Sequence, residues 1–338
     1  MTRKKLRIAI ITRFGMPLNS EAYGYYYRLY HLVNGLTDRG HQVTVLAHPD
    51  SKIKGRLVKA EVKEINWETQ LACYTEFLKN YGDQFDIINA QTDHMCCYLT
   101  PFIETPMVHT VIYGGFNDIP VVQETLEIFK KQNFITLSNS LKKVYPYLNW
   151  QGVVYNGLDI EAFKFQPKSK NYLLFLTRVE PPKGIMEAIQ AARESGEQLI
   201  IAGMADEHYF AKYIKPKLNK KISYFGCANF KQKVTLLRNA KALLHPHLLP
   251  EGFGNSMIEA QACGTPVIAY PHGSTAEVIQ HGKTGFIVKD VQQMKAAIKK
   301  INKIQRADCR DFVAQKFTLE QMVQGYEDVY YKIVNKSK

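Results

Sequence analysis

The stretch PEGFGNSMIEAQACGTPVIAY (250–270) places two carboxylates, Glu251 and Glu259, on either side of a glycine-containing segment. A pair of carboxylates can act as general acid and base, as in glycoside hydrolases. Carboxylates also accept hydrogen bonds from sugar and ribose hydroxyls without transferring a proton. The sequence leaves these roles open, because Glu251 precedes the expected helix and Glu259 lies more than a turn inside it. There, Glu259 could equally be an ordinary surface glutamate.

Gly252 and Gly254 resemble the start of the dinucleotide-binding pattern G-x-G-x-x-G, but the place of the third glycine holds Met257. That pattern also follows a strand directly, whereas the apolar run KALLHPHLLP ends in a proline-bounded loop. We therefore exclude a nicotinamide dinucleotide site. The sequence instead predicts a loop, a helix over 254–262, and a strand in TPVIAY.

Two cations follow an earlier apolar run. Arg178 ends the run NYLLFLTR, and Lys183 stands just before a helix that is expected to start near Gly184. Cations and the N–H groups of a helix start bind anions, and this pair suits a diphosphate. The alternative is that both are surface charges in a loop that also contains Glu180.

Strand-like runs alternate with helical periodicity along the whole chain, which predicts two α/β domains with doubly wound parallel sheets. The turn YNGLDIEAFKFQP marks the boundary between an amino-terminal domain, 1–157, and a carboxy-terminal domain, 158–318. We expect the domains to face each other across a cleft that holds the ligand. The predicted strands are 6–12, 42–47, 85–90, 106–113, 133–138 and 152–156, then 171–178, 197–203, 221–226, 241–247, 265–270 and 284–289.

The composition, 46% hydrophobic and 22% charged, is that of a soluble globular protein. No apolar run reaches the length of a membrane span, and the first residues lack a signal-peptide pattern, so we expect a cytoplasmic protein. A net charge of +13 favours anionic partners such as nucleotides or phospholipid headgroups, the latter through peripheral contact with the inner membrane face. The basic residues are scattered and carry no nucleic-acid-binding signature, so nucleic acid is excluded.

The six cysteines show no C-x-x-C pair and no histidines at zinc spacing. We interpret them as reduced and mostly buried. The sequence predicts neither a metal site nor a cofactor.

The segment PEGFGNSMIEAQACGTPVIAYPHGSTAEVIQHGKTGFIV closely resembles the signature of glycosyltransferase family 4, the retaining nucleotide-sugar glycosyltransferases with the GT-B fold. The family pattern E-x-F-G-x-x-x-x-E is matched by Glu251, Phe253, Gly254 and Glu259. Further matches occur in the same order along the chain: RGHQVTVLA, SNS, VVYNGLDIEAF, TRVEPPKG and FTLEQMVQGYEDVYYKIV.

The resemblance implies that Glu259 binds the ribose of the donor and that Glu251 contacts hydroxyls of the donor sugar. It implies that Phe253, Gly254 and Asn255 present backbone amides near the sugar and phosphate. The family uses no nicotinamide cofactor, so its glycines serve a nucleotide-sugar diphosphate.

Arg178 and Lys183 are implied to neutralise the departing diphosphate, in place of a metal ion. Together with Glu251 they form the expected catalytic set. Such cations stabilise charge that develops as the glycosidic bond breaks. Retention implies that the acceptor attacks from the face that the leaving group vacates, with a phosphate oxygen as the base.

The first domain departs from the family pattern on its acceptor side. Its amino-terminal loop keeps Gly24, the expected donor-side glycine, but Tyr25 stands where a second glycine is common. Asn89 and Gln91 replace an H-x-H pattern, and His109 lies one residue away from the T-x-H register. Because a one-residue slip turns a strand side chain to the opposite face, His109 is either an acceptor-side residue or an ordinary sheet residue.

The resulting prediction is a metal-independent, retaining hexosyltransferase that uses a UDP-sugar more readily than a GDP-sugar. Its acceptor would be a glycan, a lipid-linked sugar or a small molecule. Two alternatives stay open on the same fold: a nucleotide-sugar epimerase or hydrolase, and a degenerate protein that only binds nucleotide or glycan.

The carboxy-terminal segment has apolar residues at helical spacing, which predicts a helix with one buried face. We call these residues the apolar stripe: Met322, Val323, Tyr326, Val329, Tyr330 and Ile333. The resemblance implies that this helix, within 319–338, crosses back and packs on the first domain.

Overall fold

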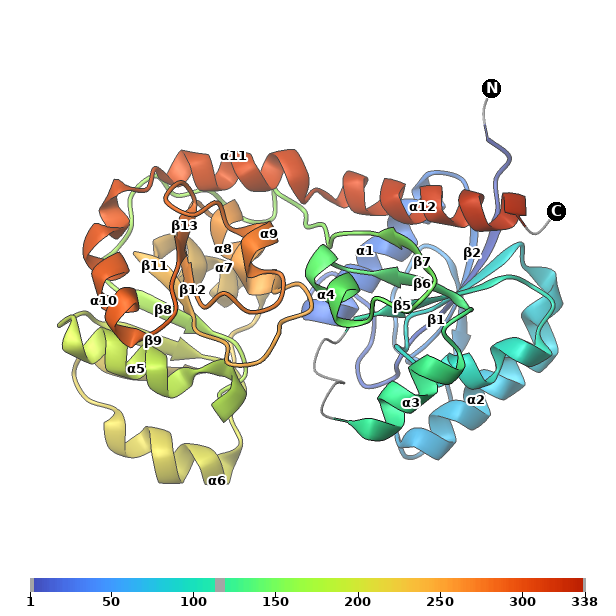
Figure 1. Cartoon of the computed structure of the whole chain (residues 1–338), viewed down its shortest axis with the longest axis horizontal. Helices are drawn as coiled ribbons and strands as arrows, with labels where there is room; N and C mark the ends of the chain where they lie inside the picture. The colour runs from blue at the N-terminus through green and yellow to red at the C-terminus, as the bar shows by residue number, and fades with distance from the viewer. Residues whose placement is uncertain (1–2, 113–118, 337–338) are drawn as a thin grey trace. The chain divides into compact units, whose positions relative to one another are not determined.

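The structure, a computed structural model, describes residues 3–112 and 119–336. The chain divides into a first unit, Met1–Gly157 with Leu319–Lys338, and a second unit, Leu158–Thr318. Each unit contains its own parallel sheet with helices packed on it (Figure 1). The pair of doubly wound α/β sheets that the sequence predicts is therefore confirmed.

In the described residues, the sheet of the first unit has seven parallel strands in the order β3-β2-β1-β4-β5-β6-β7. The strand order reverses between β1 and β4, and ligands of such sheets bind beyond the carboxyl ends of the strands at this switch point. In chain order the strands are β1 Arg7–Ile11, β2 Gln42–Ala47, β3 Arg56–Lys59, β4 Ile87–Ala90, β5 Met107–Val111, β6 Asn133–Thr136 and β7 Trp150–Val153. The helices are α1 Gly24–Asp38, α2 Trp67–Tyr81, α3 Pro120–Ile128, α4 Asn139–Val144 and α12 Leu319–Lys336.

Strand β1 shows how the sheet is buried on both faces. Ile8 and Ile10 pack with α1 and α12, whereas Ala9 and Ile11 pack with α2 on the opposite face. Successive side chains of a strand point to opposite faces, so a strand covered on both sides reads as an uninterrupted apolar run. This is why the sequence identifies the strand readily.

Helix α12 packs within the first unit beside α1 and β7 (Figure 1). All six residues of the apolar stripe are buried in the cluster that α1, β1 and β2 form. The two helices approach closely at Gly35 of α1, where an added Cβ would lie 2.5 Å from a methyl carbon of Val323. The prediction that this helix buries its stripe on the first unit is confirmed.

The second unit repeats the same winding with six parallel strands in the order β10-β9-β8-β11-β12-β13. Its switch point lies between β8 and β11. The strands are β8 Leu173–Leu176, β9 Leu199–Ala202, β10 Ile222–Gly226, β11 Ala242–His245, β12 Val267–Ala269 and β13 Gly285–Ile287. The helices are α5 Ile185–Glu194, α6 Glu207–Tyr209, α7 Phe230–Asn239, α8 Asn255–Ala262, α9 Thr275–Val278, α10 Val291–Lys300 and α11 Arg306–Lys316.

Two local expectations differ from the structure. Strand β3 was not predicted, because its four residues, RLVK, form a half-exposed edge strand with charged ends and no apolar run. The segment after β9, where the sequence pattern predicts one helix ending at about Leu218, is instead the short α6 followed by a π-helical turn over 210–214 and a 3₁₀ turn over 215–217. Pro216 lies in that last turn, where it lacks the N–H that a regular helix requires.

None of the helices in the described residues combines the length and the apolar composition needed to cross a membrane.

Candidate active site

The candidate site lies at the switch point of the second unit, beyond the carboxyl ends of β8 and β11. Lys183 belongs to the loop after β8, and Glu251 to the loop after β11. These loops touch at Gly184, which has φ 71°; an added Cβ there would lie 1.9 Å from the carbonyl oxygen of Pro246. Only glycine permits this approach, and the approach brings the lysine and the carboxylate together.

Glu251 is held on one of its oxygens by two donors. Lys183 Nζ lies 2.9 Å and His247 Nδ1 lies 2.8 Å from Glu251 Oε2. Burial opposes ionisation of this carboxyl, but the hydrogen bond from His247 and the charge of Lys183 outweigh it, so the pKa of Glu251 is held well below its usual range. Glu251 is therefore ionised at neutral pH, which suits a hydrogen-bond acceptor and not a general acid.

His245 and His247, from the end of β11 and just beyond it, form a buried stacked pair. Their ring centroids lie 3.5 Å apart with an interplanar angle of 28°. Burial lowers the pKa of both imidazoles, so both rings are neutral at neutral pH. Sequence analysis missed these residues; the signal available was the tripeptide His-Pro-His between a predicted strand and the Glu251 loop.

His245, His247 and Glu251 also have the composition of a metal site, with one potential ligand atom from each lying within 4.8 Å of the others. A metal ion binds an imidazole nitrogen along the lone pair, in the plane of the ring. His247 Nδ1 instead lies 2.8 Å from Glu251 Oε2 in a hydrogen bond, and Lys183 Nζ occupies the same oxygen. The geometry fits a hydrogen-bonded group better than a metal centre.

The second predicted carboxylate, Glu259 of α8, is buried. It is 6% exposed, and its Oε1 accepts a hydrogen bond from Lys233 Nζ at 2.7 Å. The rings of Phe163 and Phe230 lie 5.5 and 5.2 Å from the same ammonium group. The alternative of a surface glutamate is therefore wrong. Lys233 was missed, since it lies on α7 and belongs to no recognisable motif.

Arg178 lies beyond the end of β8 at the same edge of the sheet. Its guanidinium forms an ion pair with Glu180 at 3.1 Å, and its side chain is 62% exposed. Of the two predicted cations, Lys183 is the one that the structure brings to Glu251.

The predicted glycine-rich segment forms the entrance to α8. Gly254, with φ 76°, is the N-cap residue, and Asn255 is the first residue of the helix. Phe253 is buried, with its ring packed edge-on against Phe317 at 5.6 Å, and its carbonyl accepts a hydrogen bond from Ser274 Oγ. The side chain of Phe253 thus builds the core, and only its backbone could face a ligand.

The switch point of the first unit holds a different set of groups. Gly24, with φ 48°, begins α1, and the hydroxyl of Tyr25 donates a hydrogen bond to the Gln91 carbonyl at 2.7 Å. Buried Arg28 donates to Gln91 Oε1 at 2.7 Å and to the hydroxyl of Tyr326 at 2.8 Å. The predicted acceptor-side residues Tyr25 and Gln91 therefore lie together, in a network that reaches α12.

The other two candidate acceptor-side residues lie inside the sheet. Asn89 is fully buried on β4 and accepts a hydrogen bond from Thr110 Oγ1 at 3.3 Å. His109 is fully buried on β5, with Nε2 3.0 Å from Thr100 Oγ1. Burial lowers the pKa of His109 to about 3, so the ring is neutral. These are the surroundings of an ordinary sheet residue.

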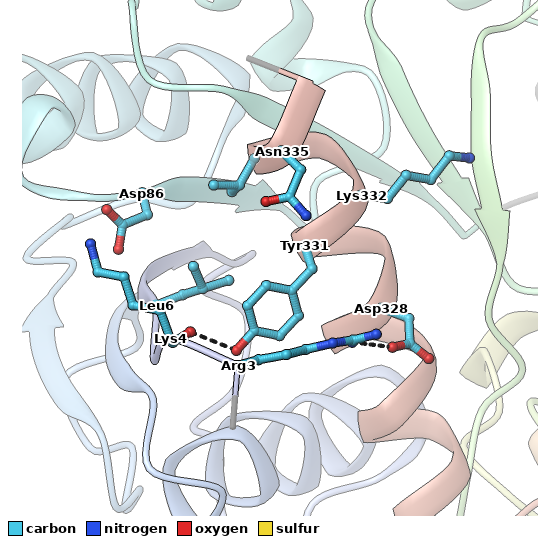
Figure 2. Close-up of a pocket in the computed structure, with 9 residues that line it drawn as sticks. Arg3, Lys4, Leu6, Asp86, Asp328, Tyr331, Lys332 and Asn335 are labelled. Atoms are coloured by element: carbon cyan, nitrogen blue, oxygen red, sulfur yellow. Dashed lines mark hydrogen bonds and ion pairs between the residues drawn. The ribbon is translucent and has the colours of Figure 1, made fainter. Parts of the chain in front are cut away.

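A separate hollow of about 630 Å³ lies at the amino end of β1 and beside the last turns of α12 (Figure 2). Its wall carries the Arg3–Asp328 ion pair and the hydrogen bond from Tyr331 to the Lys4 carbonyl. None of the predicted site residues lines it.

Comparison with known proteins finds related sequences. Residues 159–314 match the sequence model of the family described as Glycosyl transferases group 1. An uncharacterized glycosyltransferase of Methanocaldococcus jannaschii is 24% identical over 62% of this chain, and the match spans 60% of that relative's length.

Solved structures show the same fold. Sucrose-phosphate synthase from Thermosynechococcus elongatus superimposes with a TM-score of 0.85 at 17% identity, covering 98% of this chain and 100% of that one. The HepE protein of Anabaena, solved in complex with UDP-glucose, gives a TM-score of 0.77 at 18% identity and covers 97% and 100% of the two chains. The sequence match to the group 1 glycosyltransferases thus spans residues 159–314 of the second unit, and the solved structures show a similar fold.

Proposed function

We propose that the chain is a retaining hexosyltransferase that takes a sugar from a nucleotide diphosphate sugar and needs no metal ion. The observation that carries the proposal is the pair of lysine–carboxylate contacts in the second unit, Lys183–Glu251 and Lys233–Glu259. They would supply carboxylate acceptors for hydroxyls, and Lys183 would add a cation at the switch point, where ligands of doubly wound sheets bind.

The two carboxylates would bind different parts of the donor. Glu259 would accept hydrogen bonds from the ribose and Glu251 from the sugar, since an ionised carboxylate accepts strong hydrogen bonds from hydroxyls. A UDP-sugar is favoured over a GDP-sugar, because a protein with the same fold was solved with UDP-glucose.

Bond cleavage would place growing negative charge on the diphosphate. Lys183, and Arg178 with its exposed side chain, would stabilise this charge selectively in the transition state. The acceptor oxygen would then attack from the face that the leaving group vacates, with a phosphate oxygen taking its proton. The acceptor would be a glycan, a lipid-linked sugar or a small molecule, and the protein would act in the cytoplasm or at the inner face of the membrane.

The test is a screen of UDP- and GDP-sugars for thermal stabilisation, followed by mass spectrometry of products with and without acceptors. A bound donor at a hundredfold excess over its Kd stabilises the protein by roughly 2.7 kcal/mol. Transfer with a retained anomeric configuration, unaffected by EDTA, is the expected result. Donor consumption without acceptor dependence would instead indicate a hydrolase or epimerase. Binding without consumption would indicate a degenerate binding protein, and activity lost to EDTA and restored by Mg²⁺ would contradict metal independence.

A further inference from the structure

The two donors that hold Glu251 differ in mobility. Lys183 reaches the carboxylate at the end of a flexible four-carbon stem, whereas the side chain of His247 is 5% exposed and stacked on His245. Because a carboxylate only accepts, the hydrogen bond requires that Nδ1 of His247 carries the ring proton. The histidine is therefore a fixed donor, and the lysine is a movable one.

Both donors share Oε2, and this leaves the other oxygen for a ligand. Among the described residues, no hydrogen bond reaches Glu251 Oε1, and the side chain of Glu251 is 25% exposed. This inference rests on the proposed function, in which Lys183 also binds the diphosphate of the donor. A lysine that turned to the diphosphate would leave Glu251 with His247 alone.

We propose that His247 is a positioning residue that keeps Glu251 oriented toward the donor sugar while Lys183 moves from Glu251 to the diphosphate. His247 itself contacts no substrate. His247 acts through Glu251: it holds Glu251 Oε2 in place, so that Oε1 accepts a hydrogen bond from the sugar hydroxyl in one orientation. A misplacement of about 1 Å at a reacting centre can reduce the rate on the order of 10²-fold.

Two amide variants separate this role from mere packing. In His247→Asn the side-chain N–H₂ occupies the place of Nδ1, so it can still donate to Glu251. In His247→Gln the amide reaches the place of Nε2, so it cannot. The proposal expects His247→Gln to lose on the order of 10²-fold in kcat and His247→Asn to recover most of this loss. The Kd for UDP, which lacks the sugar, should stay unchanged in both variants.

A readout without turnover keeps this test separate from the proposed function. The carboxyl of Glu251 faces Lys183, His245 and His247, with Glu180 near His247, and its pKa is depressed. Loss of the His247 donor should raise this pKa, so Glu251 should protonate at a higher pH in His247→Gln than in wild type or His247→Asn. Carboxyl ¹³C NMR measures it in the ligand-free protein, with Glu251→Gln assigning the signal.

The outcomes are distinct. Absence of nucleotide binding and turnover in wild type overturns the proposed function and the Lys183 movement with it, whatever the NMR result. Turnover in wild type with equal kcat and equal Glu251 titration in the two variants overturns the role of His247. A loss of kcat that is the same in His247→Asn and His247→Gln shows a packing effect and also overturns it.

Discussion

The switch points of the two units share one topology but carry opposite chemistry. In the second unit, Lys183 meets the ionised Glu251 beyond β8 and β11, and among the described residues no hydrogen bond reaches Glu251 Oε1. In the first unit, the start of α1 and the loop after β4 carry groups already bound to one another: Tyr25 to Gln91, and Arg28 to Gln91 and to Tyr326 of α12.

The difference shows that a fold fixes where a site can form, while the side chains decide whether the site is prepared for a ligand or closed on itself. The switch point of the first unit partly holds the unit together, since Arg28 ties α1 to the loop after β4 and to α12. The second unit leaves charged groups at the edge, an arrangement that favours an anionic or hydroxyl-rich ligand. Four predictions test this contrast.

The largest effect is expected from truncation after Phe317, which removes α12. Six stripe residues would leave the core of the first unit, and burial of each side chain contributes about 1.5–3 kcal/mol. The loss is comparable with the whole stability of an ordinary domain, about 5–15 kcal/mol. The truncated chain should melt well below the full chain and bind the dye ANS; an unchanged melting temperature would show that α12 is dispensable to the first unit.

The second largest effect is expected from loss of Lys183, the cation beside Glu251 in the second unit. Lys183→Ala should reduce kcat by about 10²–10³-fold, because a preorganised positive charge at the leaving group is lost. Lys241→Ala is the matched control, since it breaks another lysine–glutamate pair of the same unit, with Glu197, away from the switch point. Equal kcat values in the two variants would remove Lys183 from the catalytic set.

Substitution of the two carboxylates should change different measured quantities. Glu259→Ala should weaken UDP binding by about 1.5–3 kcal/mol, the worth of a hydrogen bond to a charged group. Glu251→Ala should lower kcat with a UDP-sugar while leaving UDP affinity nearly unchanged, because UDP lacks the sugar that Glu251 would contact. Calorimetry with UDP and steady-state kinetics distinguish them. If both variants change UDP affinity alone, the sugar role of Glu251 is wrong.

The sequence predicted the features that depend on local pattern. Buried parallel strands such as β1 read as apolar runs, the stripe of α12 reads as helical spacing, and Glu251 and Glu259 stand in a recognisable motif. What escaped prediction depends on contacts between distant segments. Lys233 contacts Glu259 from another helix, and Arg28 contacts Tyr326, which is 298 positions away in the sequence. No local spacing of residues predicts either contact.

The smallest effect is expected in the closed switch point of the first unit. Tyr326→Phe removes the hydroxyl that accepts a hydrogen bond from Arg28 at 2.8 Å, and Arg28 is almost fully buried. Among the described residues, no ion pair compensates this guanidinium, so the lost acceptor should lower the free energy of unfolding by about 1–3 kcal/mol. A double-mutant cycle with Arg28→Met isolates the pair, because Tyr326→Phe should cost little once the guanidinium is absent. Chemical denaturation of the four proteins measures the coupling. Additive losses would mean that Arg28 and Tyr326 stabilise the unit independently, and that this edge is held closed by packing alone.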